Sequence, residues 1–188
     1  MDLPGAYRVC LLTGDSGRDG SALFRNPDLL GHVYVGPYIV GEPDLALVVA
    51  DSDGIAGYCL AVADTRAFEA WCEANWWPAL RAQYPLPADA TSDGELVGLI
   101  HVPARAPEAV VGDYPAHLHI DLLERTRGLG LGRILVERQL ASLRARGVRG
   151  VYLDVATDNA NAIAFYEHLG FAVVHRMDTS ILMARRLA

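Results

Sequence analysis

Hydrophobic and polar positions follow two different periods in the C-terminal part of the chain. Residues Ala116–Leu122 alternate strictly, which predicts a strand with one apolar and one polar face. The polar face carries His117, His119 and Asp121. After the glycines at 128–132, apolar residues recur at helical spacing to about Arg146 over a wide arc, which predicts a helix packed on a sheet.

A second strand over 149–155 follows that helix, and Gly147 separates the two. Strands joined through a helix run parallel, so 116–122 and 149–155 are expected to be a parallel pair. A further helix is expected from Asp158 or Asn159 to Leu169, ended by Gly170. Segments 171–177 and 180–187 are expected to close the chain as a hairpin.

The N-terminal half has weaker patterns. Apolar segments 45–50 and 55–63 flank Asp51-Ser52-Asp53-Gly54, which predicts a hairpin. We expect a strand over Tyr7–Leu12, a helix over 21–30, and a helix over 66–84, capped by Thr65 and interrupted at Pro78. Five prolines fall within residues 85–115, around a possible strand at 96–102. This segment is the expected seam between two halves of one domain spanning 1–188.

These elements predict an α/β fold with a mixed central sheet flanked by helices, antiparallel at its N-terminal end. The chain is 52% hydrophobic and 21% charged, a composition that supports a buried core and excludes general disorder. Its net charge of −7 argues against nucleic acid as a partner, because phosphate binding requires a basic surface. All 16 basic residues are arginine, so a phosphate loop of the Walker A type, which needs lysine, is excluded.

Composition also bears on location and on metals. The three cysteines, Cys10, Cys59 and Cys72, have neither the number nor the spacing of a disulfide framework or a zinc site, and we expect them to be buried and reduced. No segment approaches the ~18 apolar residues of a membrane span, and no signal-peptide pattern precedes the first elements. We therefore expect a cytoplasmic protein with no membrane partner and no metal.

The segment Arg127-Gly128-Leu129-Gly130-Leu131-Gly132-Arg133 lies between a predicted strand and the long predicted helix. The first amides of a helix are unpaired and carry partial positive charge, and glycines let the backbone approach a ligand, so this turn is suited to a pyrophosphate. One ligand class is a dinucleotide, with Asp154 as the ribose-binding acid. The spacing is Gly-x-Gly-x-Gly rather than Gly-x-Gly-x-x-Gly, and only about 55 residues follow, which leaves a nucleotide-dependent oxidoreductase as a minor alternative. The other class is coenzyme A.

Two motifs carry a family resemblance. Arg127-x-x-Gly130-x-Gly132 resembles the (Gln/Arg)-x-x-Gly-x-(Gly/Ala) signature of the GNAT acyltransferases. About 27 residues later, the run from Asn159 to Phe171 (NANAIAFYEHLGF) is similar to that family's N-x-x-A-I-x-x-Y-x-x-x-G-F segment. The two motifs occur in the expected order and spacing, and the resemblance covers about residues 116–175.

A narrower resemblance extends over more of the chain. Segments 6–10, 55–60 and 116–121, with the tryptophan-rich stretch around Trp76-Trp77-Pro78, resemble the acetyltransferase-like C-terminal domain of O-GlcNAcase and its stand-alone bacterial homologues. The eukaryotic domain is regarded as a degenerate acetyltransferase, whereas the glycine-rich turn here is intact. Cofactor binding is therefore expected to survive in this chain.

The resemblance implies direct transfer of an acetyl group from acetyl-CoA to an amine, with pantetheine lying where strands 116–122 and 149–155 splay apart. It implies a general acid at Tyr166, and a phenol of pKa near ~10 can protonate a departing thiolate. Asp121 is the first candidate for the general base and His119 the second. The cofactor-binding residues that the resemblance implies are Leu122, Leu123, Arg127, Gly128, Leu129, Gly130, Leu131, Gly132, Arg133, Asn159, Ala162 and Tyr166.

The acceptor remains open between a small-molecule amine and a protein lysine, and the chain is expected to be a monomer or a homodimer. Acidic net charge favours a cationic acceptor through electrostatic steering. Aromatic residues of the N-terminal half are candidates to line its pocket: Tyr34, Tyr38, Trp71, Trp76 and Trp77. The alternative function is an acetyl-CoA-binding module with little or no turnover.

Overall fold

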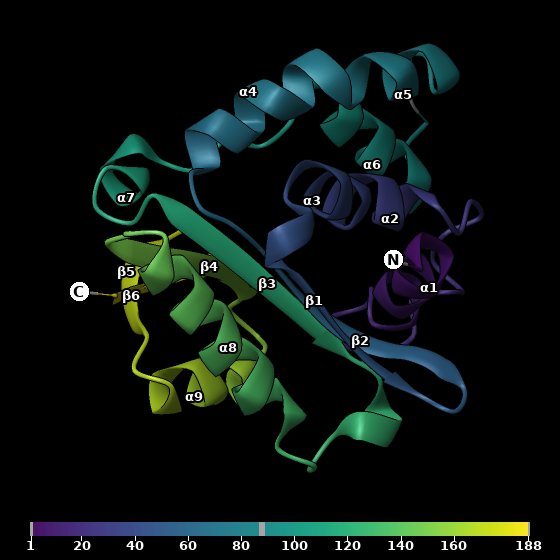
Figure 1. Ribbon diagram of the computed structural model, residues 1–188. Helices are drawn as coiled ribbons and strands as arrows, with labels where there is room; N and C mark the ends of the chain where they lie inside the picture. The colour runs from purple at the N-terminus through teal and green to yellow at the C-terminus, as the bar shows by residue number, and fades with distance from the viewer. Residues whose placement is uncertain (1, 87–88, 188) are drawn as a thin grey trace.

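The computed structural model describes residues 2–86 and 89–187, built around one six-stranded sheet in the order β1-β2-β3-β4-β6-β5 (Figure 1). The strands are β1 Ala46–Asp51, β2 Gly54–Val62, β3 Ala116–Leu122, β4 Gly150–Ala156, β5 Ala172–Arg176 and β6 Ser180–Arg186. The α-helices are α1 Leu3–Leu12, α2 Leu29–Tyr34, α3 Gly36–Gly41, α4 Thr65–Asn75, α5 Trp77–Gln83, α6 Ser92–His101, α7 Glu108–Val111, α8 Leu131–Ala145 and α9 Ala160–His168. Short 3-10 helices lie at η1 Pro43–Leu45 and η2 Glu124–Thr126.

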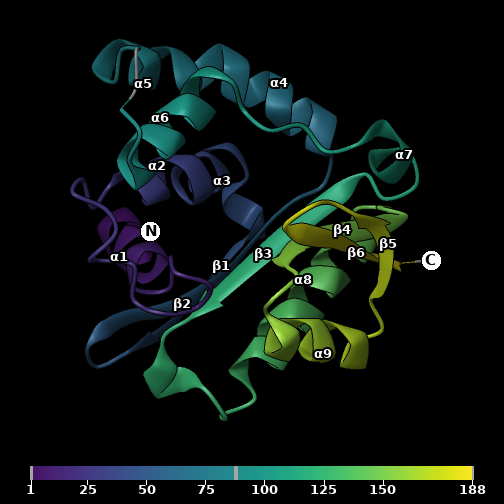
Figure 2. The same ribbon diagram turned by 180° about the vertical axis from the view of Figure 1, so that it is seen from behind.

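Helices cover the two faces of the sheet unequally. Figures 1 and 2 show α1–α6 gathered on one side of the sheet and α8 and α9 on the other. Each side has its own apolar core: α8 contributes Leu135, Leu140 and Leu143 to one, and α1 contributes Ala6 and Val9 to the other. The alternation within β3 divides its side chains between them, because Leu118 packs with α8 while the polar residues face α1–α6.

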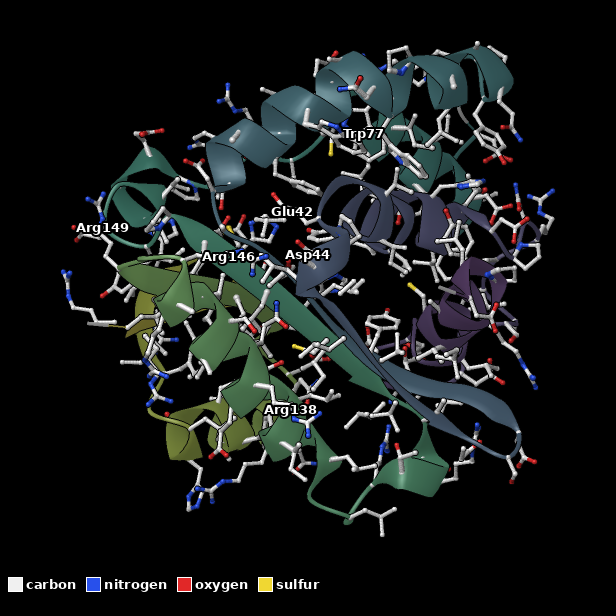
Figure 3. All side chains as sticks on the ribbon, in the orientation of Figure 1. Glu42, Asp44, Trp77, Arg138, Arg146 and Arg149 are labelled. Atoms are coloured by element: carbon white, nitrogen blue, oxygen red, sulfur yellow. The ribbon has the colours of Figure 1, made fainter. Side chains whose placement is uncertain are left out.

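Hydrogen bonds and an ion pair attach α8 to the start of β1. The Gln139 amide, fully buried, donates to the carbonyl of Leu45 at 2.9 Å. Arg146 at the end of α8 lies 3.5 Å from the Asp44 carboxylate in η1 (Figure 3). These contacts join the middle and the C-terminal end of α8 to the segment that leads into β1.

Strand pairing confirms the expected mixed sheet. β1 and β2 form the predicted hairpin, with Asp51 opposite Gly54, and β2 pairs antiparallel with β3. β3 and β4 are parallel as predicted. β5 and β6 form the closing hairpin, and β6 lies between β4 and β5.

The predicted strand at Tyr7–Leu12 is wrong, because this segment belongs to α1. Asp2 caps the helix by accepting from the Gly5 amide at 3.0 Å, and a proline lies in its first turn. Buried Ala6, Val9 and Cys10 follow i, i+3, i+4 spacing. Over so short an apolar run, strand and helix patterns are hard to separate without the cap.

Two further N-terminal predictions are wrong, the first in its extent and the second in its type. The helix expected over 21–30 begins only at Leu29, after a series of turns. The strand expected at 96–102 is helical in α6, where Thr91 caps the first turn and Leu96 and Ile100 are buried one helical turn apart. The β-branched and apolar residues of 96–102 favour a strand locally. Packing of the apolar face of α6 against the core overrides that preference.

The helix expected over 66–84 is confirmed with its interruption. α4 ends at Asn75, and α5 begins at Trp77 with Pro78 in its first turn, where a missing N–H costs nothing. The cap is Asp64, whose side chain accepts from the Ala67 amide at 3.0 Å, rather than the expected Thr65. Thr65 is therefore free to join the polar cluster described below.

Candidate functional site

β3 and β4 separate soon after they meet, as the family resemblance implies. Their paired residues are Ala116 with Val151 and His117 with Tyr152, and the ladder ends there. In an antiparallel ladder, alternate residues point their backbone groups toward the neighbouring strand. Since Leu123 donates to Ala56 on the β2 side, the backbone of Leu122 faces the opening toward β4.

Leu123, one of the residues that the resemblance implies for cofactor binding, has no free amide in this structure. Its N–H donates to the carbonyl of Ala56 at 2.9 Å, and its own carbonyl accepts from both the amide and the hydroxyl of Thr126. The residue ends the pairing with β2 and starts η2. Its backbone is therefore fully used within the fold.

The glycine-rich turn presents an open backbone surface at the start of α8. Gly128 and Gly130 have φ of +76° and +73°, and a Cβ at either position would meet nothing within 4 Å. Gly130 is the N-cap of a 15-residue helix whose first intrahelical bond runs from Ile134 to Gly130, so the amides of residues 131–133 have no intrahelical acceptor. The turn thus combines unpaired amides with the positive end of a helix dipole.

Gly132 serves a different purpose from the two glycines before it. A Cβ there would lie 3.3 Å from both the Leu122 side chain and the ring of Phe165. The first turn of α8 therefore lies against the end of β3 and against α9. This packing brings the glycine-rich turn, the strand opening and α9 together.

The two arginines of the motif are already engaged. The Arg127 guanidinium donates to the carbonyl of Gly17 at 2.5 Å, which ties the turn to the loop that follows α1. Arg133 donates to Glu137 at 2.7 Å along the exposed face of α8. Both keep positive charge beside the turn, while Leu129 between them is exposed.

α9 starts and packs as its motif predicts. The Asn159 side chain accepts from the Ala162 amide at 3.1 Å, so Asn159 is the N-cap and the Ala162 amide is used. Tyr166 is 8% exposed and makes edge contacts with Phe165 and Phe171. Burial raises the pKa of the Tyr166 phenol above its usual value, so it keeps its proton at neutral pH.

Asp121 has a partner that sequence reasoning missed. The hydroxyl of Tyr58, a fully buried residue of β2, donates to Asp121 Oδ2 at 2.6 Å. Burial raises the pKa of the Asp121 carboxyl, and this hydrogen bond opposes the rise. Tyr58 lies directly across the β2–β3 ladder from Asp121, so a predicted register between these strands could have found it.

His117 is part of a buried polar cluster. Thr65 Oγ1 lies 2.8 Å from both the Pro115 carbonyl and His117 Nδ1, and its single hydrogen is needed for the carbonyl. His117 therefore donates from Nδ1 and accepts at Nε2 from the Tyr38 hydroxyl at 2.9 Å. Burial lowers the pKa of His117 to about 3, which fits a neutral, structural ring.

His119 differs from its neighbour because its Nε2 is buried with no hydrogen-bond partner in the described structure. Its ring lies between those of Tyr38 and Tyr58, with centroids 4.7 and 5.7 Å away. Burial lowers the pKa of His119 to about 4, so the ring is neutral at pH 7. An unpaired buried nitrogen is costly unless a ligand or water satisfies it, and this one borders a cavity.

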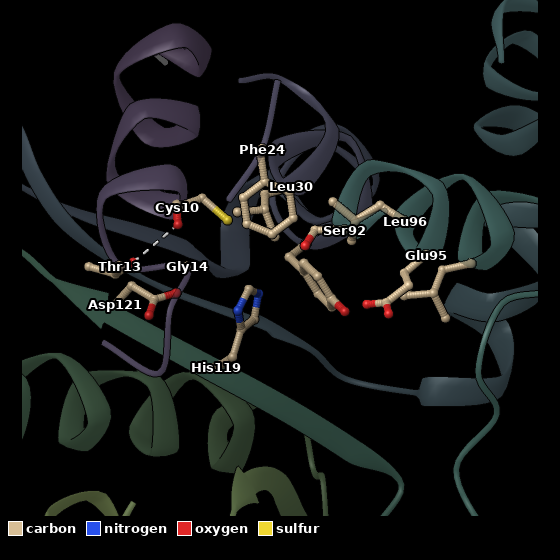
Figure 4. Close-up of a pocket in the computed structure, with 12 residues that line it drawn as sticks. Cys10, Thr13, Gly14, Phe24, Leu30, Ser92, Glu95, Leu96, His119 and Asp121 are labelled. Carbon is tan, nitrogen blue, oxygen red and sulfur yellow. Dashed lines mark hydrogen bonds between the residues drawn. The ribbon is translucent and has the colours of Figure 1, made fainter. Parts of the chain in front are cut away.

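Two adjoining cavities meet at His119, Tyr34 and Leu99. The smaller, about 430 Å³, extends from Asp121 toward α6 (Figure 4). The larger, about 830 Å³, is bordered by both β3 and β4 at the opening between them. Among the aromatic residues predicted to line an acceptor pocket, Tyr34, Tyr38 and Trp77 border these cavities, whereas Trp71 and Trp76 pack against the core.

The cysteines are free and buried, as expected. Within residues 2–86 and 89–187, no group of three or more His, Cys, Asp or Glu is placed to hold a metal ion. Over the same residues, no helix combines the length and the apolar character required to cross a membrane.

Comparisons with known proteins agree with this geometry. The chain is 38% identical to the crystal structure of SsHAT, covering 100% of this chain and 94% of that one, with a TM-score of 0.92. It is 28% identical to protein O-GlcNAcase of Rattus norvegicus over 94% of this chain, and 31% identical to mycothiol acetyltransferase of Corynebacterium glutamicum (strain R) over 85%. The chain spans only 20% of the first relative's length and 52% of the second's.

A family model described as the acetyltransferase (GNAT) family matches residues 57–171, which is more than half of the chain. The match runs from β2 to the residue before β5 and includes the glycine-rich turn, β3, β4 and α9. Members of this family generally use acetyl-CoA. The chain belongs to the acetyltransferase (GNAT) family.

Proposed function

We propose that this chain is an N-acetyltransferase that moves an acetyl group directly from acetyl-CoA to a primary amine. The observation that carries the proposal is the convergence of three features: the open glycine turn, the separated β3 and β4, and polar side chains of β3 beside a cavity. The turn and the strand opening suit a long anionic ligand. The cavity on the other side suits a second substrate.

The backbone of the turn would hold the diphosphate. Amides of residues 128–133 with Arg127 and Arg133 provide donors and positive charge, and the two open glycines leave space above the backbone. Pantetheine would lie between the separated strands, where the backbone of Leu122 offers polar groups. Asn159 would contribute by fixing the start of α9, since its side chain is used as the cap.

Asp121 is the proposed general base. Its carboxyl lies at one end of the smaller cavity, and Tyr58 fixes its orientation. Its raised pKa makes it a better proton acceptor than an ordinary aspartate. His119 is the second candidate, because its ring is neutral and one nitrogen has no partner in the described structure.

Tyr166 is the proposed general acid. An amine that enters as an ammonium loses one proton to Asp121 and forms its bond to the acetyl carbon as the carbon–sulfur bond breaks. The leaving sulfur takes a proton from Tyr166, which regains one from the nitrogen as the amide forms. The balance is one ammonium and one thioester consumed, and one amide, one thiol and one proton released.

Calorimetry with acetyl-CoA, coenzyme A and NAD is the first test. We expect acetyl-CoA to bind and NAD not to bind; the reverse would favour the oxidoreductase alternative and overturn the proposal. A CoA-release assay on a panel of amines is the second test. Binding of acetyl-CoA without release of CoA on any amine would instead support the alternative of a binding module with little turnover.

A further inference from the structure

The smaller cavity has acidic groups at two separate ends. Figure 4 shows Asp121 on β3 at one end and Glu95 on α6 at the other, with His119 between them. Asp121 accepts a hydrogen bond from Tyr58, whereas Glu95 is exposed and has no ion-pair partner among the residues described. A ligand that spans the cavity would contact a carboxylate at each end.

Among the described residues that line the cavity, no positively charged side chain compensates these carboxylates. Among the twelve residues drawn around the cavity there is no arginine, and the whole chain contains no lysine. His119, the one remaining basic side chain there, is neutral at pH 7 because burial lowers its pKa to about 4. The cavity therefore attracts cations and disfavours a ligand that carries a carboxylate.

The wall between the two ends is mostly apolar. It is formed by Phe24, Leu30, Leu96 and Leu99 with the buried thiol of Cys10. Such a surface suits methylene groups, and a volume of about 430 Å³ falls in the range of roughly 300–1,000 Å³ that small ligands occupy. The smaller cavity therefore has an acidic side chain at each end and apolar side chains between them.

We infer that the acceptor is an unbranched aliphatic diamine, with one nitrogen at Asp121 and His119 for acetylation and a second ammonium held by Glu95. This inference rests on the proposed function and names its substrate class. Glu95 is a specificity-determining residue in this arrangement, since it contacts the end of the substrate that does not react. A monoamine lacks that contact, and an ω-amino acid places a second negative charge beside Glu95.

The test compares a diamine with a monoamine of equal heavy-atom count, and with two acceptors of other charge or size. CoA release is measured with cadaverine, n-hexylamine, aminocaproate and a peptide with one internal lysine. We expect kcat/KM for cadaverine to exceed that for n-hexylamine by up to about five-fold, the upper end of the effect of one exposed ion pair, and aminocaproate to be the poorest acceptor. Glu95→Gln should raise KM for cadaverine until this preference disappears.

Asp53→Asn is the matched control, because Asp53 is exposed in the β1–β2 turn and its removal changes net charge equally. It should leave the preference for cadaverine intact. Equal kcat/KM for the diamine and monoamine, or a better rate on the lysine peptide, would overturn the inference while the proposed function stands.

If no amine is acetylated, calorimetry of cadaverine with the CoA-saturated protein tests whether the cavity binds a diamine. Binding that weakens in Glu95→Gln supports the diamine site. The absence of binding, or binding that Glu95→Gln does not change, overturns it. Failure of the proposed function itself would show separately, as no binding of acetyl-CoA or as no release of CoA with any amine.

Discussion

Asp121 lies where two opposing influences set its proton affinity. Enclosure raises the pKa of the carboxyl, and the hydrogen bond from Tyr58 lowers it. A base must be deprotonated to act, so the rate should rise with pH through the pKa of Asp121 and level off above it. The acidic limb of the plot of rate against pH therefore reports the pKa of Asp121, which the hydrogen bond from Tyr58 helps to set.

Replacing Tyr58 with phenylalanine removes the hydrogen bond and keeps the ring that packs beside His119. The pKa of Asp121 should rise further, so the acidic limb of the kcat/KM profile should move to higher pH, while kcat at the plateau changes less. Measuring the profile from pH 4 to 9 in both proteins checks this. If the limb stays in place in Tyr58→Phe but moves in His119→Gln, the base is His119.

Tyr166 donates a proton only if its phenol stays protonated, and burial raises its pKa so that it does. Tyr166→Phe removes the hydroxyl and preserves the edge contacts with Phe165 and Phe171. We expect kcat to fall by roughly 10²–10⁴, the usual contribution of a general acid, with acetyl-CoA affinity nearly unchanged. Tyr114→Phe is the control, since Tyr114 lies near α7 with Arg186 over its ring. A Tyr166→Phe enzyme with normal kcat would remove this residue from the chemistry.

At the scale of elements, the glycine turn between η2 and α8 depends on a left-handed backbone conformation at Gly130. Gly130 and Gly98 both have open space where a Cβ would be, but only Gly130 has positive φ. Alanine at Gly98, inside α6, should stabilise the protein by about 0.5–1 kcal/mol. Alanine at Gly130 should destabilise it by about 1–2 kcal/mol, because the left-handed conformation is unfavourable with a Cβ.

The same pair of variants tests the diphosphate site. The Cβ of Gly130→Ala would occupy the space above the unpaired amides, so acetyl-CoA affinity should fall about ten-fold, which corresponds to about 1.4 kcal/mol. Gly98→Ala should bind normally. Thermal unfolding and calorimetry on the two variants measure both effects. Unchanged acetyl-CoA binding in Gly130→Ala, with the loss of stability observed, would contradict a ligand held by this backbone.

The elements that the sequence predicted correctly are those whose pattern is local. Strict alternation in 116–122 specified which side chains share a face, and glycines flanking a 15-residue amphipathic helix specified the parallel pair. Tyr58 and Asp121 are 63 residues apart and meet only through the β2–β3 register, so their hydrogen bond was not visible from either segment. The Glu95 end of the cavity required α6, which the sequence pattern assigned to a strand.

Charge is divided unequally over the whole molecule. Residues 1–115 hold 16 acidic residues and 6 arginines, whereas residues 116–188 hold 7 acidic residues and 10 arginines. The acidic part supplies α1 and α6, which enclose the smaller cavity, and the basic part supplies the glycine turn. An anionic cosubstrate and a cationic acceptor would each be attracted to the half that binds it.

Salt should therefore weaken both encounters, because the Debye length falls from about 10 Å at 0.1 M to about 3 Å at 1 M ionic strength. We expect KM for a diamine to rise several-fold between these ionic strengths, and KM for n-hexylamine to rise less because it carries one charge. Potassium chloride and potassium glutamate should act alike if screening is the cause. A salt response that is the same for both amines would contradict electrostatic attraction of the second ammonium, because the Coulomb attraction to acidic groups grows with the charge of the ligand.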